Sequence, residues 1–240
     1  MNFLSYDIEI YEDLIDGQPV DLTKITPSVA AVCTNEDDVQ FFYDEPFMNK
    51  KTAQTLVEII SDYYDNGYIP FTWNGLSFDF PLLGYYSGMI DQCAHLALNS
   101  VDAMFMVVAN KGHNLGLDTA LVGAGLETKT HHVKLNNGEE ISDMSGAKAP
   151  TFWRNGEFEA VKTYLRGDVI QPLKLTFAIE KNHGIKWTSK TGRSQFLSTN
   201  LITVKDCLKI REPDISWMTN PKSRSEYYSW IPKEVLDKEL

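Results

Sequence analysis

The chain has 240 residues, with a hydrophobic fraction of 43%, a charged fraction of 23% and a formal net charge of −11. These values are typical of globular proteins and exclude wholesale disorder, and the length suits one large domain or a tight pair. Apolar runs such as residues 104–109 are far shorter than the roughly 20 residues of a membrane helix, so we expect no membrane partner. Acidic residues within the first ten positions argue against a signal peptide. Three widely spaced cysteines predict neither a disulfide framework nor a thiolate zinc site, which favours a reducing cytoplasm.

The charge is distributed unevenly along the chain. A negative total argues at face value against a nucleic-acid partner, because phosphates attract Lys and Arg. Residues 1–120, however, carry a net charge of −14, whereas residues 121–240 carry +3. Residues 174–211 alone carry +6, with Trp187 and Phe196 interleaved. This stretch suits either tracking of a single strand by phosphate contacts and base stacking, or a solvated hairpin whose aromatic side chains face the core.

Hydrophobic periodicity predicts alternating strands and helices. Apolar runs bounded by turn residues predict strands at residues 3–10, 28–34, 39–43 and 68–73. Apolar residues at helical spacing predict helices at residues 49–65, 78–87, 115–124, 157–168 and 173–182. Pro172 is expected to kink the chain or to separate the last two helices. Three strands in succession, then a helix and a further strand, indicate an α/β fold with a mixed β-sheet flanked by α-helices.

The remaining segments are less regular. Residues 96–109 are apolar but interrupted by polar residues, so their secondary structure stays open. Asp102 within them is interpreted as a solvated loop residue, with a position beside a metal as the alternative. Residues 127–151 lack periodicity and predict a long loop.

The C-terminal part of the chain carries turn residues and aromatic residues. Residues 185–188 and 194–197 flank a turn sequence that contains Gly192, which predicts a β-hairpin. The tail from Asp214 is expected to extend over the surface of the domain. We therefore expect a core at residues 1–182, with the hairpin and tail at residues 183–240 packed on the same domain.

Two carboxylates alternate along the first predicted strand. Asp7 and Glu9 are two residues apart, so their side chains project from the same face. Neighbouring carboxylates repel each other unless they share a cation or a proton. The pair by itself is weak evidence for a cation site, because a solvated strand face shows the same pattern.

Two further segments carry an acid at the edge of a predicted helix. The sequence Trp-Asn-Gly-Leu-Ser-Phe-Asp-Phe-Pro places Asp79 near a helix N-terminus, where an aspartate is also a common capping residue. Tyr164 and Asp168 are four residues apart on one helix face, although a core tyrosine above a surface aspartate has the same spacing. Together with the strand pair, these acids offer four oxygen ligands suited to Mg²⁺ or Mn²⁺. Two such ions can bind the attacking and the leaving oxygen of a phosphoryl displacement.

The three segments resemble the three exonuclease motifs of the DnaQ-like (DEDD) 3′–5′ exonucleases, a branch of the ribonuclease H-like superfamily. Asp-x-Glu resembles the first motif, and Asn-Gly-x-x-Phe-Asp-x-Pro resembles the second as it occurs in the family-B-polymerase-like group. Tyr-x-x-x-Asp resembles the third motif in its tyrosine form, called DEDDy. The histidine form would place a histidine at position 163, where this chain has Thr163. The order and spacing of the motifs agree across residues 3–182.

The resemblance implies a ribonuclease H-like α/β fold and a metal-dependent 3′–5′ exonuclease. Such an enzyme would release nucleoside 5′-monophosphates from a 3′ end, with single-stranded DNA as the expected substrate. By this resemblance Asp7 would bridge two Mg²⁺ or Mn²⁺ ions. Glu9 and Asp168 would complete the ion on the nucleophile side, and Asp79 would hold the other. Tyr164 would position the attacking water with help from Glu9.

Several polar and aromatic residues are candidate substrate contacts. The resemblance assigns Asn74 a hydrogen bond to the terminal nucleotides and Phe78 a packing contact with a base or sugar. His113 and Asn114 precede a predicted helix, and they either cap it or touch the substrate. The histidine pair at residues 131–132 could ligate a metal, although a surface position or a phosphate contact is favoured without a Cys or carboxylate at ligand spacing.

Two alternatives to a DNA exonuclease stay open. A non-catalytic nucleic-acid-binding or polymerase-accessory module could share the fold, but the presence of all four acids and Tyr164 favours an enzyme. An RNA 3′-end exonuclease would share every catalytic residue and would differ only in contacts to the 2′-OH. We expect any proofreading to serve a polymerase in trans. Pro172 removes the amide that would bond to the Asp168 carbonyl, which could shift that ligand.

Overall fold

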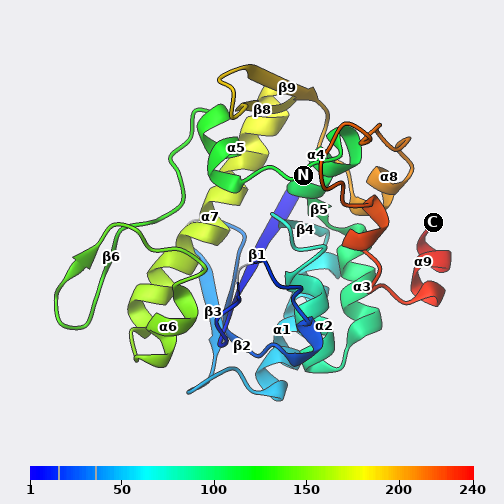
Figure 1. Ribbon diagram of the computed structural model, residues 1–240. Coiled ribbons are helices and arrows are strands. Elements are labelled where there is room, and N and C mark those ends of the chain that lie inside the picture. Colours follow the sequence, from blue (N-terminus) through cyan, green and yellow to red (C-terminus); the bar gives the residue numbers. More distant parts are fainter. Residues whose placement is uncertain (16, 36) are drawn as a thin grey trace.

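A five-stranded mixed β-sheet forms the centre of the fold (Figure 1). The computed structural model describes residues 1–15, 17–35 and 37–240. Strands β1 (Asn2–Ile10), β2 (Pro27–Cys33) and β3 (Val39–Tyr43) form an antiparallel meander. Strand β4 (Tyr68–Thr72) pairs in parallel with β1, and β5 (Val101–Asp102) pairs in parallel with β4. The sheet and its flanking helices confirm the predicted α/β class.

Helices α1 (Lys50–Asp65), α2 (Asp79–Ser87) and α3 (Ile90–Asn99) pack together beside the sheet. Helix α1 starts where the Asn49 side chain accepts a hydrogen bond from the Thr52 amide at 2.9 Å. Its buried residues recur at helical spacing along one face: Ala53, Leu56, Val57 and Ile60. The helices predicted at residues 49–65 and 78–87 are confirmed, whereas α3 was not predicted.

Helix α7 (Phe158–Asn182) packs across β1 and β2 and is continuous through Pro172. The predicted separation into two helices at Pro172 is therefore wrong, and a kink within the single helix stays a prediction. Residues on both sides of the proline, including Val169 and Leu173, are buried, and this packing offsets the hydrogen bond that the proline lacks. None of the described helices, α7 included, is both long and apolar enough to cross a membrane.

The segment whose state the sequence left open contains the end of α3, β5 and helix α4 (Ala103–Lys111). Seven of the nine residues of α4 are buried. A helix that is apolar all round shows no helical periodicity, so the pattern gave no signal there. Asp102 is the N-cap of α4 and is 1% exposed, which contradicts its interpretation as a solvated loop residue.

Residues 127–151 are mainly irregular, as predicted, but they include the short strands β6 (Val133–Lys134) and β7 (Glu140–Ile141). Helix α6 (Ala149–Arg154) starts inside the predicted loop and is anchored by the buried Trp153. The segment follows α5 (Leu117–Gly123) and leads back towards α7.

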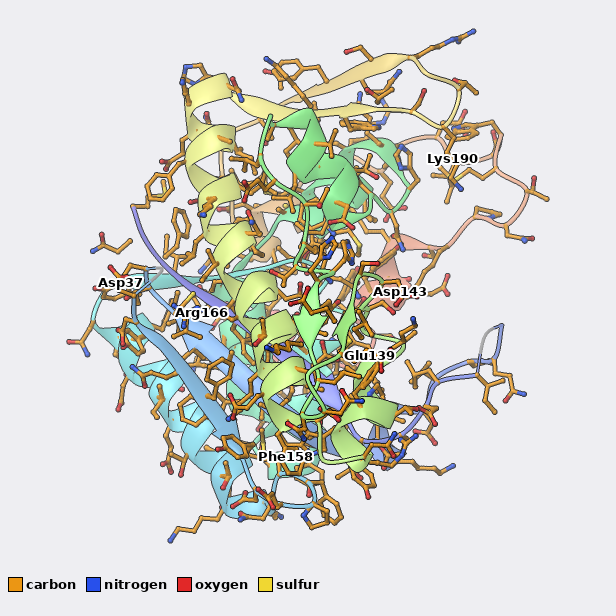
Figure 2. All side chains as sticks on the ribbon, turned by 90° about the vertical axis from the view of Figure 1, so that its left-hand side faces the viewer. Asp37, Glu139, Asp143, Phe158, Arg166 and Lys190 are labelled. Carbon is orange, nitrogen blue, oxygen red and sulfur yellow. The ribbon has the colours of Figure 1, made fainter. Side chains whose placement is uncertain are left out.

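The predicted hairpin is formed by β8 (Gly184–Thr188) and β9 (Ser194–Ser198). Figure 2 shows it at the C-terminal end of α7, with Lys190 at its turn and Phe158 at the other end of the helix. Strand β8 packs against α5 and α7, and Trp187 is only 5% exposed, whereas Phe196 is 45% exposed. One of the two interleaved aromatic residues thus faces the core and the other faces solvent.

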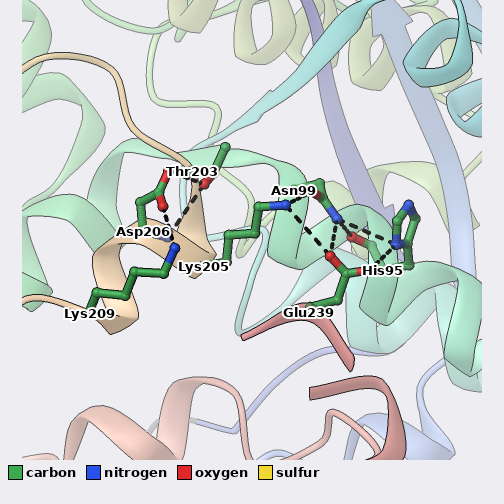
Figure 3. Close-up of polar contacts among 7 residues, drawn as sticks. All are labelled: His95, Asn99, Thr203, Lys205, Asp206, Lys209 and Glu239. Carbon is green, nitrogen blue, oxygen red and sulfur yellow. Dashed lines mark hydrogen bonds and ion pairs between the residues drawn. The ribbon is translucent and has the colours of Figure 1, made fainter. Parts of the chain in front are cut away.

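The C-terminal tail is more helical than predicted. It contains a 3₁₀ turn at Arg224–Tyr227 and helix α9 (Lys233–Glu239), so a wholly extended tail is wrong. Figure 3 shows the contacts of Glu239, at the end of α9, with α3. Asn99 Nδ2 donates to Glu239 Oε2 at 3.0 Å, and His95 Nδ1 lies 2.6 Å from Glu239 Oε1. Lys205, on helix α8 (Val204–Leu208), donates to Asn99 Oδ1 at 2.5 Å.

Candidate active site

Strand β1 and helix α7 bring three carboxylates together. One oxygen each from Asp7, Glu9 and Asp168 lies within 4.8 Å of the others. Glu9 and Asp168 are buried, and Asp7 is half-buried. The interpretation of the Asp7 and Glu9 pair as a solvated strand face is therefore wrong, and so is that of Asp168 as a surface residue.

The fourth acid, Asp79, is attached to the same strand. It is the first residue of α2 rather than its N-cap, and it is 4% exposed. Its Oδ1 atom accepts a hydrogen bond from the Ile8 amide at 3.1 Å, and the Tyr6 hydroxyl donates to its backbone oxygen at 3.2 Å. The N-terminus of α2 is thereby fixed against β1 between the two strand acids.

The turn before α2 has an unusual backbone. Asn74 has a φ of 77°, in the left-handed region that few non-glycine residues adopt. At Gly75 a Cβ atom would lie 2.6 Å from the Thr72 side chain, so only glycine fits. Asp102 stabilises this turn by accepting from the amides of Asn74 at 3.1 Å and Leu76 at 2.9 Å.

The residues of the third sequence motif contact a lysine that the sequence did not indicate. Lys129 Nζ lies 2.7 Å from Asp168 Oδ2 and donates to the Tyr164 hydroxyl at 2.7 Å. The loop that carries Lys129 can approach α7 because of Gly167, where a Cβ atom would lie 2.3 Å from Thr130 Oγ1.

The loop is anchored on its other side by Asp118 of α5. The Lys129 amide donates to Asp118 Oδ1 at 2.8 Å, and His131 Nε2 lies 3.2 Å from Asp118 Oδ2. His131 Nδ1 also lies 2.8 Å from the Met144 carbonyl. No periodicity or motif marks this loop, so the sequence carries no signal for Lys129. His132 lines a separate cavity of about 590 Å³.

Burial and mutual repulsion raise the pKa values of these acids. Burial raises the pKa of Asp7, and the charges of Asp79, Asp168 and Glu9 raise it further. Burial raises the pKa of Asp79 to about 7, against the opposing effect of the hydrogen bond from the Ile8 amide. Burial likewise raises the pKa of Asp168, while Lys129 lowers it in part. The site is therefore short of positive charge.

Burial and the negative charges of these acids also shift the pKa values of Lys129 and Tyr164. Burial lowers the pKa of Lys129, but Asp168 and Asp7 outweigh this effect, so its pKa lies above the ordinary lysine value. Burial, followed by the charge of Asp168, raises the pKa of the Tyr164 hydroxyl. At neutral pH the lysine is thus a cation and the tyrosine a neutral hydrogen-bonding group.

Seven of the nine predicted site residues line one cavity of about 430 Å³, and Lys129 lines it with them. The seven are Asp7, Glu9, Asn74, Phe78, Asp79, Tyr164 and Asp168. His113 and Asn114 have other contacts. His113 Nδ1 lies 3.0 Å from the Asn114 carbonyl, and the Asn114 side chain accepts from the Tyr227 hydroxyl. The N-cap of α5 is Gly116, so the expectation that this pair caps the helix is wrong.

The donor set of the cavity fits a divalent cation. Asp168 Oδ1 is buried without a hydrogen-bond partner among the described residues, although its other oxygen is paired with Lys129. A buried carboxylate oxygen without a partner is costly unless a cation completes it. Closely spaced carboxylate oxygens are the ligands that Mg²⁺ and Mn²⁺ prefer.

Comparisons with known proteins support the fold. Neither a protein-family model nor a curated protein sequence matches the chain. The structure is similar to the family B DNA polymerase of the archaeon Pyrobaculum calidifontis, with a TM-score of 0.55 and 17% identity over 74% of this chain. The chain covers 24% of the polymerase. Exonuclease I of E. coli in complex with an oligonucleotide gives a TM-score of 0.30 and 12% identity, over 75% of this chain and 40% of that enzyme, which is too distant to carry an argument.

Proposed function

We propose that the protein is a metal-dependent 3′–5′ exonuclease of the DnaQ-like, DEDDy type. The observation that carries this proposal is the meeting of three separate sequence motifs in one cavity, where four acids and Tyr164 lie together. The second motif resembles the family-B-polymerase-like group, and the fold is similar to that of a family B DNA polymerase. The sequence motif and the similarity in fold both support this proposal.

Four carboxylates would hold the metal ions. Asp7, Glu9 and Asp168 have oxygen atoms close enough to share an ion, and Asp79 is fixed beside them on β1. Two Mg²⁺ or Mn²⁺ ions, when bound, would stabilise the charge on the attacking and leaving oxygens of the phosphodiester. The free Oδ1 atom of Asp168 is available to an ion without loss of the Lys129 contact.

Tyr164 and Lys129 would act on the attacking water and on the charge of the phosphate. The Lys129 ammonium donates to the Tyr164 hydroxyl, which fixes the oxygen and leaves its proton for an acceptor. Gly146 faces Tyr164 and Glu9, since a Cβ atom there would lie 3.8 Å from the hydroxyl and 4.0 Å from Glu9 Oε2. Because Gly146 has no side chain, a water would have room between the Tyr164 hydroxyl and the Glu9 carboxylate. Glu9 could then accept a proton from that water.

Asn74 and Phe78 would bind the end of the strand. Both line the carboxylate cavity. The left-handed backbone of Asn74 is strained and is maintained by the bonds to Asp102, as is common where a residue must meet a ligand. We propose a hydrogen bond from Asn74 and a packing contact from Phe78 to the 3′-terminal nucleotide of single-stranded DNA, with nucleoside 5′-monophosphates as products.

The biological setting is part of the proposal. Three buried free thiols suit a reducing cytoplasm. Residues 1–182 would supply the catalytic core, with residues 183–240 packed on the same domain. Any proofreading would serve a polymerase in trans. An RNA 3′-end exonuclease is the second candidate for the substrate, and a non-catalytic accessory module is the alternative to an enzyme.

The test is hydrolysis of a single-stranded oligonucleotide labelled at its 3′ end in one sample and at its 5′ end in another. With Mg²⁺ or Mn²⁺ the 3′ label should appear at once as a mononucleotide, while the 5′ label should move through a ladder of shorter products. The Asp7→Ala variant should show neither result. Binding without cleavage in either metal would support the accessory module, and a faster reaction on RNA would change the substrate.

A further inference from the structure

A second cavity lies beside the carboxylate cavity, between residues 20–23, residues 77–85 and the C-terminal tail. It measures about 480 Å³, and we call it the tail cavity. One wall consists of Phe78, the residue before α2, and of Pro81 and Tyr85, which share one face of the helix at a spacing of four residues. The tail supplies Tyr227 and Trp230 to the opposite wall.

The two cavities share a wall. Phe78 lines the carboxylate cavity on one side and the tail cavity on the other. The loop between β1 and β2 borders both as well, since Leu14 lines the first and Val20 lines the second. A nucleic-acid strand whose end lies in the carboxylate cavity could therefore extend past Phe78 into the tail cavity.

The tail cavity offers aromatic side chains among polar ones. The ring of Trp230 is fixed beside the turn before α2, because its Nε1 donates to the Leu76 carbonyl at 2.7 Å. Tyr85 is 36% exposed at the rim, whereas the ring of Tyr227 is buried and is covered by Lys222, whose Nζ lies 4.0 Å from its centre. Aromatic side chains beside an exposed cation are the surface on which single-stranded bases stack in a sequence-tolerant manner.

The two acids of the tail cavity are already engaged. Asp21 pairs with Lys24 at 2.9 Å and accepts from the Thr23 amide. Glu226 accepts from the Ser223 amide at 2.6 Å as part of a capping box. Their presence disfavours phosphate groups in the cavity and favours uncharged bases, with the phosphates left on the solvent side near Lys222.

We propose that the tail cavity binds the bases of the nucleotides that precede the scissile 3′ end of a single strand. This inference rests on the proposed function, because it needs the strand end in the carboxylate cavity. We assign this occupant because the two cavities are adjacent. The Phe78 side chain, which lines both, lies between them. The protein then discriminates by length, binding an oligonucleotide of several residues better than a mononucleotide ester.

The test uses two substrates: the p-nitrophenyl ester of thymidine 5′-monophosphate, which reaches only the carboxylate cavity, and single-stranded dT10, which reaches both. Tyr85→Ala should lower kcat/KM on dT10 by about fivefold or more through the lost stacking contact. Its rate on the ester should stay within twofold of that of the wild type. Tyr85→Phe keeps the ring and should restore the rate on dT10.

Phe177→Ala is the matched control, because Phe177 is a 69% exposed aromatic residue that lines a different cavity, with Met1 and Asn2. It should leave both rates unchanged. Equal rates of the Tyr85→Ala variant and the wild type on dT10 would overturn the inference, as would an equal loss on both substrates.

Binding supplies a readout that does not depend on turnover. In the Asp7→Asn background, fluorescence anisotropy should show tighter binding of labelled dT10 than of dT2, and Tyr85→Ala should abolish most of that difference. If the wild type cleaves neither substrate, the proposed function fails. The length-dependent binding would still support the tail cavity as a strand site, and its absence would overturn it.

Discussion

The buried carboxylate of Asp102 and the buried acidic cluster that contains Asp168 differ in how many hydrogen bonds their oxygens accept. Asp102 is 1% exposed and accepts hydrogen bonds from three backbone amides: those of Asn74, Leu76 and Phe105. Asp168 is 5% exposed, and one of its oxygens has no partner among the described residues. Two carboxylates that are both buried thus differ: the oxygens of Asp102 are hydrogen-bonded within the fold, whereas one oxygen of Asp168 is left for a ligand.

The comparison separates a structural acid from a ligand. A carboxylate that receives several amide bonds is stabilised within the fold and holds the segments that donate them. A cluster of acids that repel one another and include an unpaired oxygen is destabilising in the isolated chain, which is explained if a cation completes it. The two groups therefore predict opposite responses to substitution.

The largest expected effect is on catalysis. Asp168→Asn should lower the rate of 3′-end hydrolysis by about a thousandfold, because the amide removes a charged ligand worth several kcal/mol in the transition state. The thermal unfolding temperature without metal should not fall. A variant that retains more than a tenth of the wild-type rate would show that Asp168 is not a ligand.

The next effect concerns stability. Asp102→Ala should lower the free energy of unfolding by about 3 kcal/mol, because three buried amides lose their acceptor and α4 loses its cap. Chemical denaturation with urea measures this change, with and without Mn²⁺. Asp102→Asn, which keeps one acceptor oxygen, should lose less. A neutral Asp102→Ala variant would contradict the structural role.

The pH dependence of stability tests the same contrast. The pKa of Asp79 is raised to about 7 in the folded chain from an ordinary value of 3.8, so the folded state keeps its proton to higher pH than the unfolded state. The free energy of unfolding of the metal-free protein should therefore fall as pH rises from about 4 through about 7. Between pH 5 and pH 8 the loss should be on the order of 2 kcal/mol.

Urea denaturation in the presence of a chelator measures this loss, and Asp79→Asn is its control. The amide can still accept from Ile8 and does not titrate, so the variant should be less sensitive to pH in this range. An unchanged pH profile would show that Asp79 is not responsible.

The smallest expected effect concerns Tyr164 and Lys129, the pair proposed to orient the water. Tyr164→Phe should lower the rate of hydrolysis about tenfold, because one hydrogen bond to the nucleophile is lost, while the affinity for Mn²⁺ stays the same. Lys129→Met should have a similar effect on rate through the loss of the bond to the Tyr164 hydroxyl. A normal rate of the Tyr164→Phe variant would mean that the hydroxyl plays no part.

The sequence predicted four of the five strands of the central sheet, and among the described helices it predicted α1, α2, α5 and the two halves of α7, because local periodicity marks these elements. Asp7 and Glu9 share a strand face, and Tyr164 and Asp168 share a helix face, so their side-chain directions follow from spacing alone. That Asp79 joins them depends on a long-range contact, its bond to the Ile8 amide, and only the motif resemblance indicated it.

Other features could not be predicted because tertiary contacts create them. Lys129 reaches the acids only through a loop that packs on Gly167 and is tied to Asp118. The N-cap role of Asp102 was hidden because α4 is apolar all round. The aromatic wall of the tail cavity joins residues about 150 positions apart along the chain, such as Tyr85 and Trp230.

The central claim is that the acidic cluster is a binding site for divalent cations. Isothermal titration of the metal-free wild type with Mn²⁺ at pH 7.5 tests it most directly, with Asp7→Asn and Asp102→Asn measured in parallel. We predict binding of up to two ions by the wild type, at least tenfold weaker binding by Asp7→Asn, and binding like that of the wild type by folded Asp102→Asn. Absence of Mn²⁺ binding to the wild type, or equal binding by Asp7→Asn, would contradict the account.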